Sequence, residues 1–276
     1  MMQISIVTPT WNQSNFIERT IESVISQEGD FELEYIVMDG GSTDGTVDIL
    51  KKYDKIIKKE KKYKHIKFIW KSEKDKGQSD AINKGMKLAK GKIVAFINSD
   101  DTYEPDTFKK VLSRAEQKPN RKWFFGKCKI VDENDKEIRK PITWYKNILL
   151  NLHSIPMLIS ENYISQPATF WRRSIMEEIG YFDEDEHMVM DYEYWLRISD
   201  KYGDGFFIND YLANFRMYDT SKSGTRFKEQ FKDELRVAKR YGKNYPLSIL
   251  IHYVNYIKII GIYTCMNNIN KLIKNK

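Results

Sequence analysis

Cysteine is scarce in this sequence. Cys128 and Cys265 are the only two among 276 residues, and they form no CxxC pair. A disulfide framework and a structural zinc site are therefore poorly supported. The chain does not open on a cationic leader followed by a long apolar run, which argues against a secretory signal. These absences predict a protein that works in a reducing cytoplasm.

Internal repeats and low-complexity linkers are also absent from the sequence. Hydrophobic residues make up 41% of the chain and charged residues 31%, which excludes a disordered tail protein and a collagen-like fibre. The length suits one domain plus an appendage, or at most two small domains. The net charge of +7 favours anionic partners such as nucleotides, nucleic acid or acidic lipid, without choosing among them.

Short apolar runs alternate with helical patterns in the first hundred residues. The runs predict strands at residues 4–7, 35–38, 66–70 and 93–97, and the patterns between them predict helices at residues 15–27, 46–57 and 79–89. Asn15 and Glu18 resemble a capping box at the start of the first helix. Such strand-then-helix units predict an α/β fold with a mostly parallel sheet and helices on its faces.

The pattern is less regular in the second half of the chain. Residues 123–131 predict a strand, and residues 132–135 predict a hairpin turn after it. An aromatic- and leucine-rich segment, a short strand and two helices follow, at residues 142–159, 166–171, 174–179 and about 191–199.

Polar segments follow each of the first four predicted strands. Because ligands bind beyond the carboxyl ends of the strands in such sheets, these segments should converge on one crevice. They are residues 8–12, 39–45, 72–79 and 98–101.

Each carboxylate predicted in that crevice could have either a binding role or a structural role. Asp100 and Asp101 follow a strand and could hold a divalent cation on a nucleotide diphosphate, although such a pair is more often a turn or a helix cap. Asp39 could accept a hydrogen bond from a pyrimidine N3–H, or could belong to a glycine-rich turn in which Asp44 caps the next helix.

Lysines are concentrated between residues 51 and 76, a segment that contains twelve lysines and four acidic residues. A nucleic-acid site would also contain arginines and stacking aromatics. The lysines fall mostly on the polar face of one predicted helix and in the loop after it, so we expect a solvated surface and no nucleic-acid partner.

Four of these segments together strongly resemble family 2 glycosyltransferases with the GT-A fold. They are residues 4–12, 39–46, 72–85 and 98–101, and the ordered match spans about residues 3–220. The resemblance implies a Rossmann-like three-layer GT-A domain over residues 1–220, with a nucleotide-sugar-binding half at 1–101 and an acceptor-binding half at 102–220. Residues 221–276 would form a helical C-terminal extension.

The resemblance implies inverting sugar transfer from a nucleoside diphosphate sugar, with Mn or Mg on the diphosphate and UDP as the commonest carrier in the class. Asp100 would bind the metal, while Asn98 stands where the family usually has the first Asp of Asp-x-Asp. Gly40 likewise replaces a frequent second Asp, a variant found in capsule and exopolysaccharide enzymes. The implied donor site comprises Thr8, Pro9, Thr10, Asn12, Asp39, Asp75, Asn98, Ser99 and Asp100.

The catalytic base that inversion requires would be Asp191, at the start of a helix in the second half. Glu193 remains a competitor, and in a purely structural reading Asp191 caps its helix and pairs with Arg197. Gln166 would lie on the acceptor side. Tyr218 stands near the position where many members have a histidine metal ligand.

The tail from residue 245 to 276 lies outside the resemblance. Its apolar stretch is interrupted by His252, Asn255 and Lys258, and further lysines follow. It is either an interfacial helix on anionic lipid or a helix packed on the domain or on a second copy.

The resemblance implies an enzyme of cell-surface polysaccharide assembly in the cytoplasm, peripheral on the inner face of the membrane. Its acceptor would be a saccharide or a lipid-linked saccharide. A sugar nucleotidyltransferase and a non-catalytic nucleotide-binding module are the alternatives.

Overall fold

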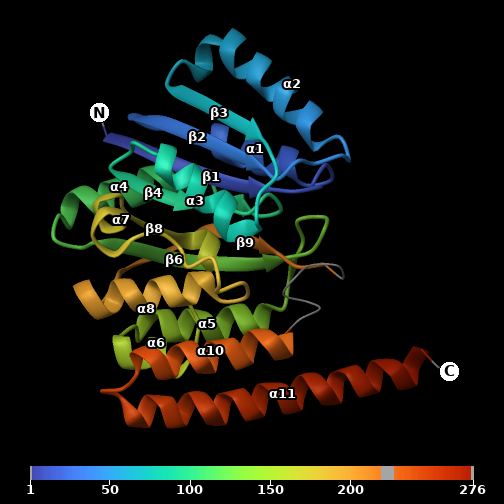
Figure 1. The fold of residues 1–276 in the computed structure, drawn as a ribbon, viewed down its shortest axis with the longest axis vertical. Coiled ribbons are helices and arrows are strands. Elements are labelled where there is room, and N and C mark those ends of the chain that lie inside the picture. Colours follow the sequence, from blue (N-terminus) through green and yellow to red (C-terminus); the bar gives the residue numbers. More distant parts are fainter. Residues whose placement is uncertain (1, 219–226, 275–276) are drawn as a thin grey trace.

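The computed structural model describes residues 2–218 and 227–274, and a nine-stranded sheet forms its centre (Figure 1). The strand order is β3-β2-β1-β4-β8-β6-β9-β5, with β7 paired to β6. The first four predicted strands are confirmed, and they run parallel at one side of the sheet. Their bounds are β1 (Met2–Thr10), β2 (Phe31–Asp39), β3 (Ile66–Ser72) and β4 (Ile93–Phe96).

The second half of the sheet is mixed. β8 pairs antiparallel with both β4 and β6, whereas β9 runs parallel to β6 and antiparallel to β5. The predicted hairpin is confirmed, because β6 turns at Asp132 and pairs back on β7. The remaining strands are β5 (Thr102–Tyr103), β6 (Trp123–Val131), β7 (Glu137–Ile138), β8 (Thr169–Arg172) and β9 (Phe206–Arg216).

Helices cover both faces of the sheet and give the predicted three-layer fold. One apolar core lies under the three helices α1 (Ile17–Ile25), α2 (Thr46–Lys59) and α4 (Thr107–Gln117). The other core includes buried side chains of α3 (Gln78–Leu88), α5 (Lys140–Asn151), α6 (Ile155–Ser160), α7 (Ser174–Ile179) and α8 (Met190–Tyr202). Two short 3₁₀ turns complete this part of the chain, η1 (Lys61–Tyr63) and η2 (Gln166–Ala168).

The predicted capping box at α1 is wrong. The helix begins after Phe16 without a side-chain cap, and Glu18 does not reach back to Asn15. Glu18 instead accepts hydrogen bonds from Lys52 and Tyr53 of α2, because it faces that neighbouring helix. The apolar face predicted for α1 is confirmed, since Ile17, Ile21, Val24 and Ile25 are all buried.

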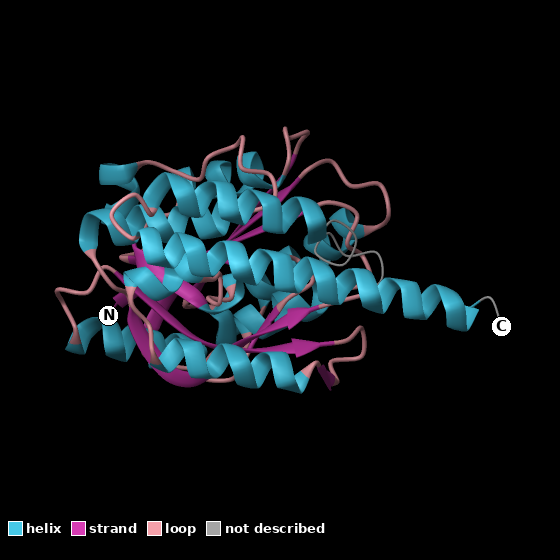
Figure 2. Ribbon diagram, turned by 90° about the horizontal axis from the view of Figure 1, so that it is seen from below, coloured by secondary structure: helices cyan, strands magenta, loops and turns pink. Residues whose placement is uncertain are grey.

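The C-terminal helices are α10 (Phe227–Tyr241) and α11 (Pro246–Lys274). Val237 and Ala238 of α10 are buried in the same core as α8. One face of α11 packs on α6, where His252 Nδ1 lies 2.7 Å from the Ile159 carbonyl oxygen. The far end of α11 projects beyond the body of the protein (Figure 2). In the described part of the chain, no helix has the length and apolarity needed to cross a bilayer.

Candidate active site

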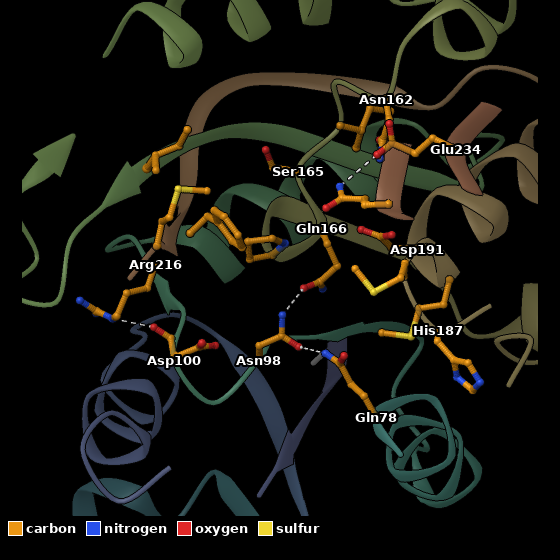
Figure 3. Close-up of a pocket in the computed structure, with 18 of the residues that line it drawn as sticks. Gln78, Asn98, Asp100, Asn162, Ser165, Gln166, His187, Asp191, Arg216 and Glu234 are labelled. Atoms are coloured by element: carbon orange, nitrogen blue, oxygen red, sulfur yellow. Dashed lines mark hydrogen bonds between the residues drawn. The ribbon is translucent and has the colours of Figure 1, made fainter. Parts of the chain in front are cut away.

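A cavity of about 990 Å³ opens where β1 and β4 end. Three of the four predicted polar segments line it, residues 8–12, 72–79 and 98–101, whereas no residue of 39–45 does. Its walls come from both halves of the chain and also from α10 and α11 (Figure 3). Eight of the expected site residues line it. They are Pro9, Thr10, Asp75, Asn98, Ser99, Asp100, Gln166 and Asp191.

Asp100 and Asp101 have different roles, although they are adjacent. Asp101 is buried and structural: its Oδ1 accepts from the Arg216 backbone N–H at 2.8 Å, and Asn98 donates to Oδ2. Asp100 lines the cavity, and Tyr218 donates its phenol proton to Oδ2 at 2.9 Å. Burial raises the pKa of the Asp100 carboxyl. Asp101 therefore has the structural role of a turn residue, whereas the Asp100 carboxylate faces the cavity.

Arg216 fixes this turn from the end of β9. Its buried guanidinium donates to the backbone oxygens of Asp100 and Asp132, at 2.7 and 2.6 Å, and forms an ion pair with Asp135. These contacts join the loops after β4 and β6. Arg216 thus holds the backbone that carries Asp100 in place.

A chain of amides crosses the cavity floor (Figure 3). Gln78 donates to Asn98 Oδ1 at 2.7 Å, and Asn98 in turn donates to Gln166 Oε1 at 3.4 Å. Gln166 also donates to the Phe96 carbonyl oxygen at 2.7 Å. Asn98 therefore links α3 to η2.

Two residues of the first polar segment, residues 8–12, lie outside the cavity. Thr8 is fully buried in the sheet, where its hydroxyl lies 3.2 Å from the Tyr35 hydroxyl. Asn12 adopts a positive φ of 51° and ties its own loop to the next one, because its Oδ1 accepts from the Thr43 N–H. Thr10 does line the cavity, and its hydroxyl is buried without a partner in the described residues.

Asp39 organises the loop after β2 and is not among the cavity-lining residues. Its carboxylate accepts from the N–H groups of Gly41 and Ser42 and from the hydroxyls of Ser42 and Ser72. The hydrogen bonds of the turn are therefore enough to account for a carboxylate at position 39. Asp75 lines the cavity beside this loop and accepts from the Gly77 N–H at 2.9 Å.

The two acidic residues at the start of α8 also differ in their surroundings, as Asp100 and Asp101 do. Asp191 lines the cavity, and its Oδ1 accepts from the Tyr192 N–H at 2.8 Å. Glu193 is buried away from the cavity, where it pairs with Arg197 at 2.6 Å and accepts from the Tyr241 hydroxyl. Arg197 therefore pairs with Glu193, and the arrangement favours Asp191 over Glu193 as a base.

The C-terminal helices contribute residues that sequence reasoning missed. Glu234 of α10 and His252 of α11 are buried and line the cavity. Asn162, between α6 and η2, is another lining residue that the sequence did not indicate. The signal for Glu234 was present in the sequence, since Phe231, Leu235 and Ala238 lie at i−3, i+1 and i+4 from it, on the same side of the helix. A carboxylate within an apolar stripe is a candidate functional group.

The donor set at Asp100 suits a divalent cation with oxygen ligands. Magnesium and manganese sites often use one or two carboxylates, with phosphate oxygens and water completing the shell. Asp100 supplies one half-buried carboxylate facing a cavity that can hold a nucleotide. Among residues 2–218 and 227–274, no group of three His, Cys, Asp or Glu side chains forms a metal cluster. The cation would therefore depend on the diphosphate for most of its ligands.

Comparison with solved structures shows the same fold in glycosyltransferases. A crystal structure of S. aureus TarS superposes with a TM-score of 0.64 and 19% identity, covering 92% of this chain and 43% of that one. The mannosyltransferase PcManGT from Pyrobaculum calidifontis, in complex with GDP-Man and Mn²⁺, superposes with a TM-score of 0.62 and 14% identity, covering 95% and 79%.

Sequence comparison leads to the same group of proteins. TuaG of Bacillus subtilis, named as a glycosyltransferase of teichuronic acid biosynthesis, is 28% identical over 231 residues, which are 82% of this chain and 83% of TuaG. The model of glycosyl transferase family 2 matches residues 5–180, well over half of the chain. The chain therefore belongs to glycosyl transferase family 2.

Proposed function

We propose that the protein is an inverting glycosyltransferase that moves a sugar from a UDP-sugar to a hydroxyl of a saccharide or lipid-linked acceptor. One observation carries the proposal. Asp100 and Asp191 come from different elements yet line one cavity, and Figure 3 places them on different walls of it. Such a cavity can hold a diphosphate near one carboxylate and an acceptor hydroxyl near the other.

In the proposed reaction, Asp191 accepts the proton of the acceptor hydroxyl as the oxygen attacks the anomeric carbon. The new C–O bond forms on the face opposite the breaking bond to the diphosphate, which leaves with the bonding electron pair. The configuration at that carbon is thereby inverted. A divalent cation at Asp100, Mn or Mg, would neutralise charge on the departing diphosphate when it is bound.

The donor side of the cavity would bind the nucleotide through the loops after β1, β3 and β4. Pro9, Thr10 and Asp75 would contact the base and ribose, and Asn98 and Ser99 would contact the ribose and phosphates. UDP is favoured by the frequency of UDP-sugars in this class and by the complexes of TarS with UDP and UDP-GlcNAc. Thr8, Asn12 and Asp39 would support this side from behind by fixing the loops.

The proposed cellular role is cell-surface polysaccharide assembly on the inner face of the membrane. Apolar side chains at 247, 250, 251, 254 and 257 form an exposed stripe on α11, and Trp144 and Ile148 are exposed on α5. Both helices line the cavity, and the exposed cations Arg139, Lys140 and Lys258 lie on the same two elements or next to them. An anionic lipid surface would complement both the apolar stripe and the positive charge.

Nucleotide binding and transfer can be tested separately. A thermal-shift panel of UDP, GDP, dTDP, CDP and their common sugars, each with Mn, Mg or EDTA, should give a metal-dependent stabilisation with one base. Asp191→Asn should keep that stabilisation and lose sugar transfer by about a hundredfold or more. No stabilisation by any nucleotide would contradict the donor site, and full transfer by the variant would contradict the base.

A further inference from the structure

Glu234 lies in the middle of α10, beyond the residues that the family model matches. Its side chain is buried and lines the cavity. Asn162 and Gln230 both donate to its Oε1, each at 3.1 Å. Figure 3 shows Glu234, Asn162 and Asp191 on the same side of the cavity, away from Asp100 and Arg216. Glu234 is thus part of the wall that would receive the acceptor.

Asn162 has an unfilled hydrogen-bonding capacity at this wall. Its Nδ2 donates to Glu234, but its buried Oδ1 has no hydrogen-bond partner among the described residues. A buried carbonyl oxygen without a partner is destabilising, and a bound hydroxyl donor would recover that cost. Asn162 Oδ1 is therefore an unsatisfied acceptor in the cavity wall, which a ligand hydroxyl would reach once the Asn162 side chain turns toward the cavity.

The surroundings of Glu234 keep about half of its carboxyl groups protonated near pH 7. Burial raises the pKa of its carboxyl to about 7, and the negative charge of Asp191 raises it further, against the opposing effects of the Gln230 and Asn162 hydrogen bonds and of Lys146. The titratable groups around it are Asp191 and Tyr192 on α8, Lys146 on α5, His252 on α11 and Glu161 before η2. A protonated carboxyl can donate a hydrogen bond, which a carboxylate cannot.

We propose that Glu234 and Asn162 bind a hydroxyl group of a neutral acceptor sugar, next to the hydroxyl that Asp191 deprotonates. The sugar hydroxyl would donate to Asn162 Oδ1 and accept from the Glu234 carboxyl. This inference rests on the proposed transferase function and names the acceptor class for it. An acidic sugar would be disfavoured at this position, because its carboxylate would lie next to the Asp191 carboxylate.

The experiment uses the full chain, the UDP-sugar found in the nucleotide panel, and methyl glycosides as acceptor probes. Methyl glucoside, galactoside, mannoside and N-acetylglucosaminide are compared with methyl glucuronide and galacturonide, and released UDP is measured. Wild-type protein should use at least one neutral glycoside about tenfold better, in kcat/KM, than the matched uronide. Equal use of a neutral glycoside and its uronide would overturn the inference.

Variants then test the two residues directly. Glu234→Ala and Asn162→Ala should each raise the acceptor KM about tenfold, the equivalent of one good hydrogen bond, while donor KM stays within twofold. Glu234→Gln keeps an N–H donor, so its acceptor KM should stay near wild type at pH 6.5. Between pH 6 and 8.5 the wild-type acceptor KM should rise severalfold, as Glu234 loses its proton, whereas that of Glu234→Gln should stay flat.

A matched control distinguishes acceptor binding from a structural role. Glu186 is another buried carboxylate that binds α10, through Arg236 and Arg240, but it is not among the cavity-lining residues. Glu186→Gln should lower the melting temperature and leave the acceptor KM unchanged. Unchanged acceptor KM in both alanine variants would overturn the inference while leaving the transferase function intact. No transfer by wild type to any glycoside would overturn the inference, and only the additional absence of stabilisation by any nucleotide would overturn the transferase function.

Discussion

Tyr218 donates its phenol proton to Oδ2 of Asp100 at 2.9 Å, at the edge of the candidate donor site. Burial and the nearby Asp100 charge raise the pKa of Tyr218 to about 12, so the phenol stays protonated at neutral pH. Gln13 donates to the same phenol oxygen at 3.3 Å. The resemblance to family 2 enzymes implies a histidine metal ligand near this position in many members. This chain instead positions a hydrogen-bond donor on the carboxylate.

Replacing Tyr218 with histidine should strengthen metal binding. An imidazole nitrogen would stand beside Asp100 and add a second protein ligand for Mn²⁺. We expect the affinity for Mn²⁺ in the presence of UDP to rise about tenfold at pH 8 and less at pH 6, because protonated histidine cannot bind a metal. Calorimetric titration of Mn²⁺ into the UDP complex measures this. Tyr218→Phe is the control, and an equal gain in that variant would show that the imidazole is not the cause.

Glu193 should prove to be a structural residue. Its carboxylate is 3% exposed and pairs with Arg197, so removing its charge leaves Arg197 without its partner. Glu193→Gln should cost about 2–4 kcal/mol in the free energy of unfolding, measured by urea denaturation. At a temperature where the variant is folded, kcat should stay within about threefold of wild type. A hundredfold loss of kcat in the folded variant would instead return the base assignment to Glu193.

The sequence predicts the parallel half of the fold well because its signals are local. Each early strand is a short apolar run followed by a polar segment, and a parallel sheet places those segments at one edge. The strand at residues 123–131 and the helix at 174–179 are found with the predicted bounds. Gly180 ends that helix at φ 82°, a conformation that favours glycine.

The orientation of individual side chains could not be predicted in the same way. Asp39 and Asp100 both follow strands, yet only Asp100 lines the cavity, because the turn after β2 uses the Asp39 carboxylate for its own N–H groups. Asp191 and Glu193 differ for a similar reason, since Arg197 lies one helical turn from Glu193. The position of Glu234 depends on how α10 docks on the core, which no local pattern specifies.

Stability should depend on pH through Glu234. Its pKa is raised from an ordinary 4.5 to about 7 in the folded protein, so the unfolded chain binds fewer protons at this site between those values. The free energy of unfolding therefore falls as the pH rises from about 4.5 through 7. Glu234→Gln removes this loss and should be stabilised relative to wild type at pH 8, by on the order of 2 kcal/mol, but not at pH 4.5.

Urea denaturation of both proteins at pH 4.5, 6 and 8 measures that difference. The Glu186→Gln variant serves as the control, because Arg236 holds the pKa of the Glu186 carboxyl below its usual value. Loss of that ion pair should destabilise the variant at pH 8, in the opposite direction to Glu234→Gln. A Glu234→Gln protein with the same pH dependence as wild type would contradict the raised pKa.

The apolar stripe on α11 should bind anionic membranes. Leu247, Leu250 and Val254 are 67%, 59% and 55% exposed, so changing all three to serine removes apolar surface with little effect on packing. Each side chain partly buried in lipid contributes about 1 kcal/mol or more, and the triple variant should bind phosphatidylglycerol vesicles at least tenfold more weakly in sedimentation assays.

A second triple variant serves as a control for charge alone. Lys51, Lys55 and Lys58 of α2, which are all exposed, are changed together to glutamine. Because α2 lies beside β3, at the opposite end of the molecule from α11 (Figure 1), this control should bind vesicles nearly as well as wild type. Equal binding by the serine variant and wild type would contradict a membrane role for the stripe.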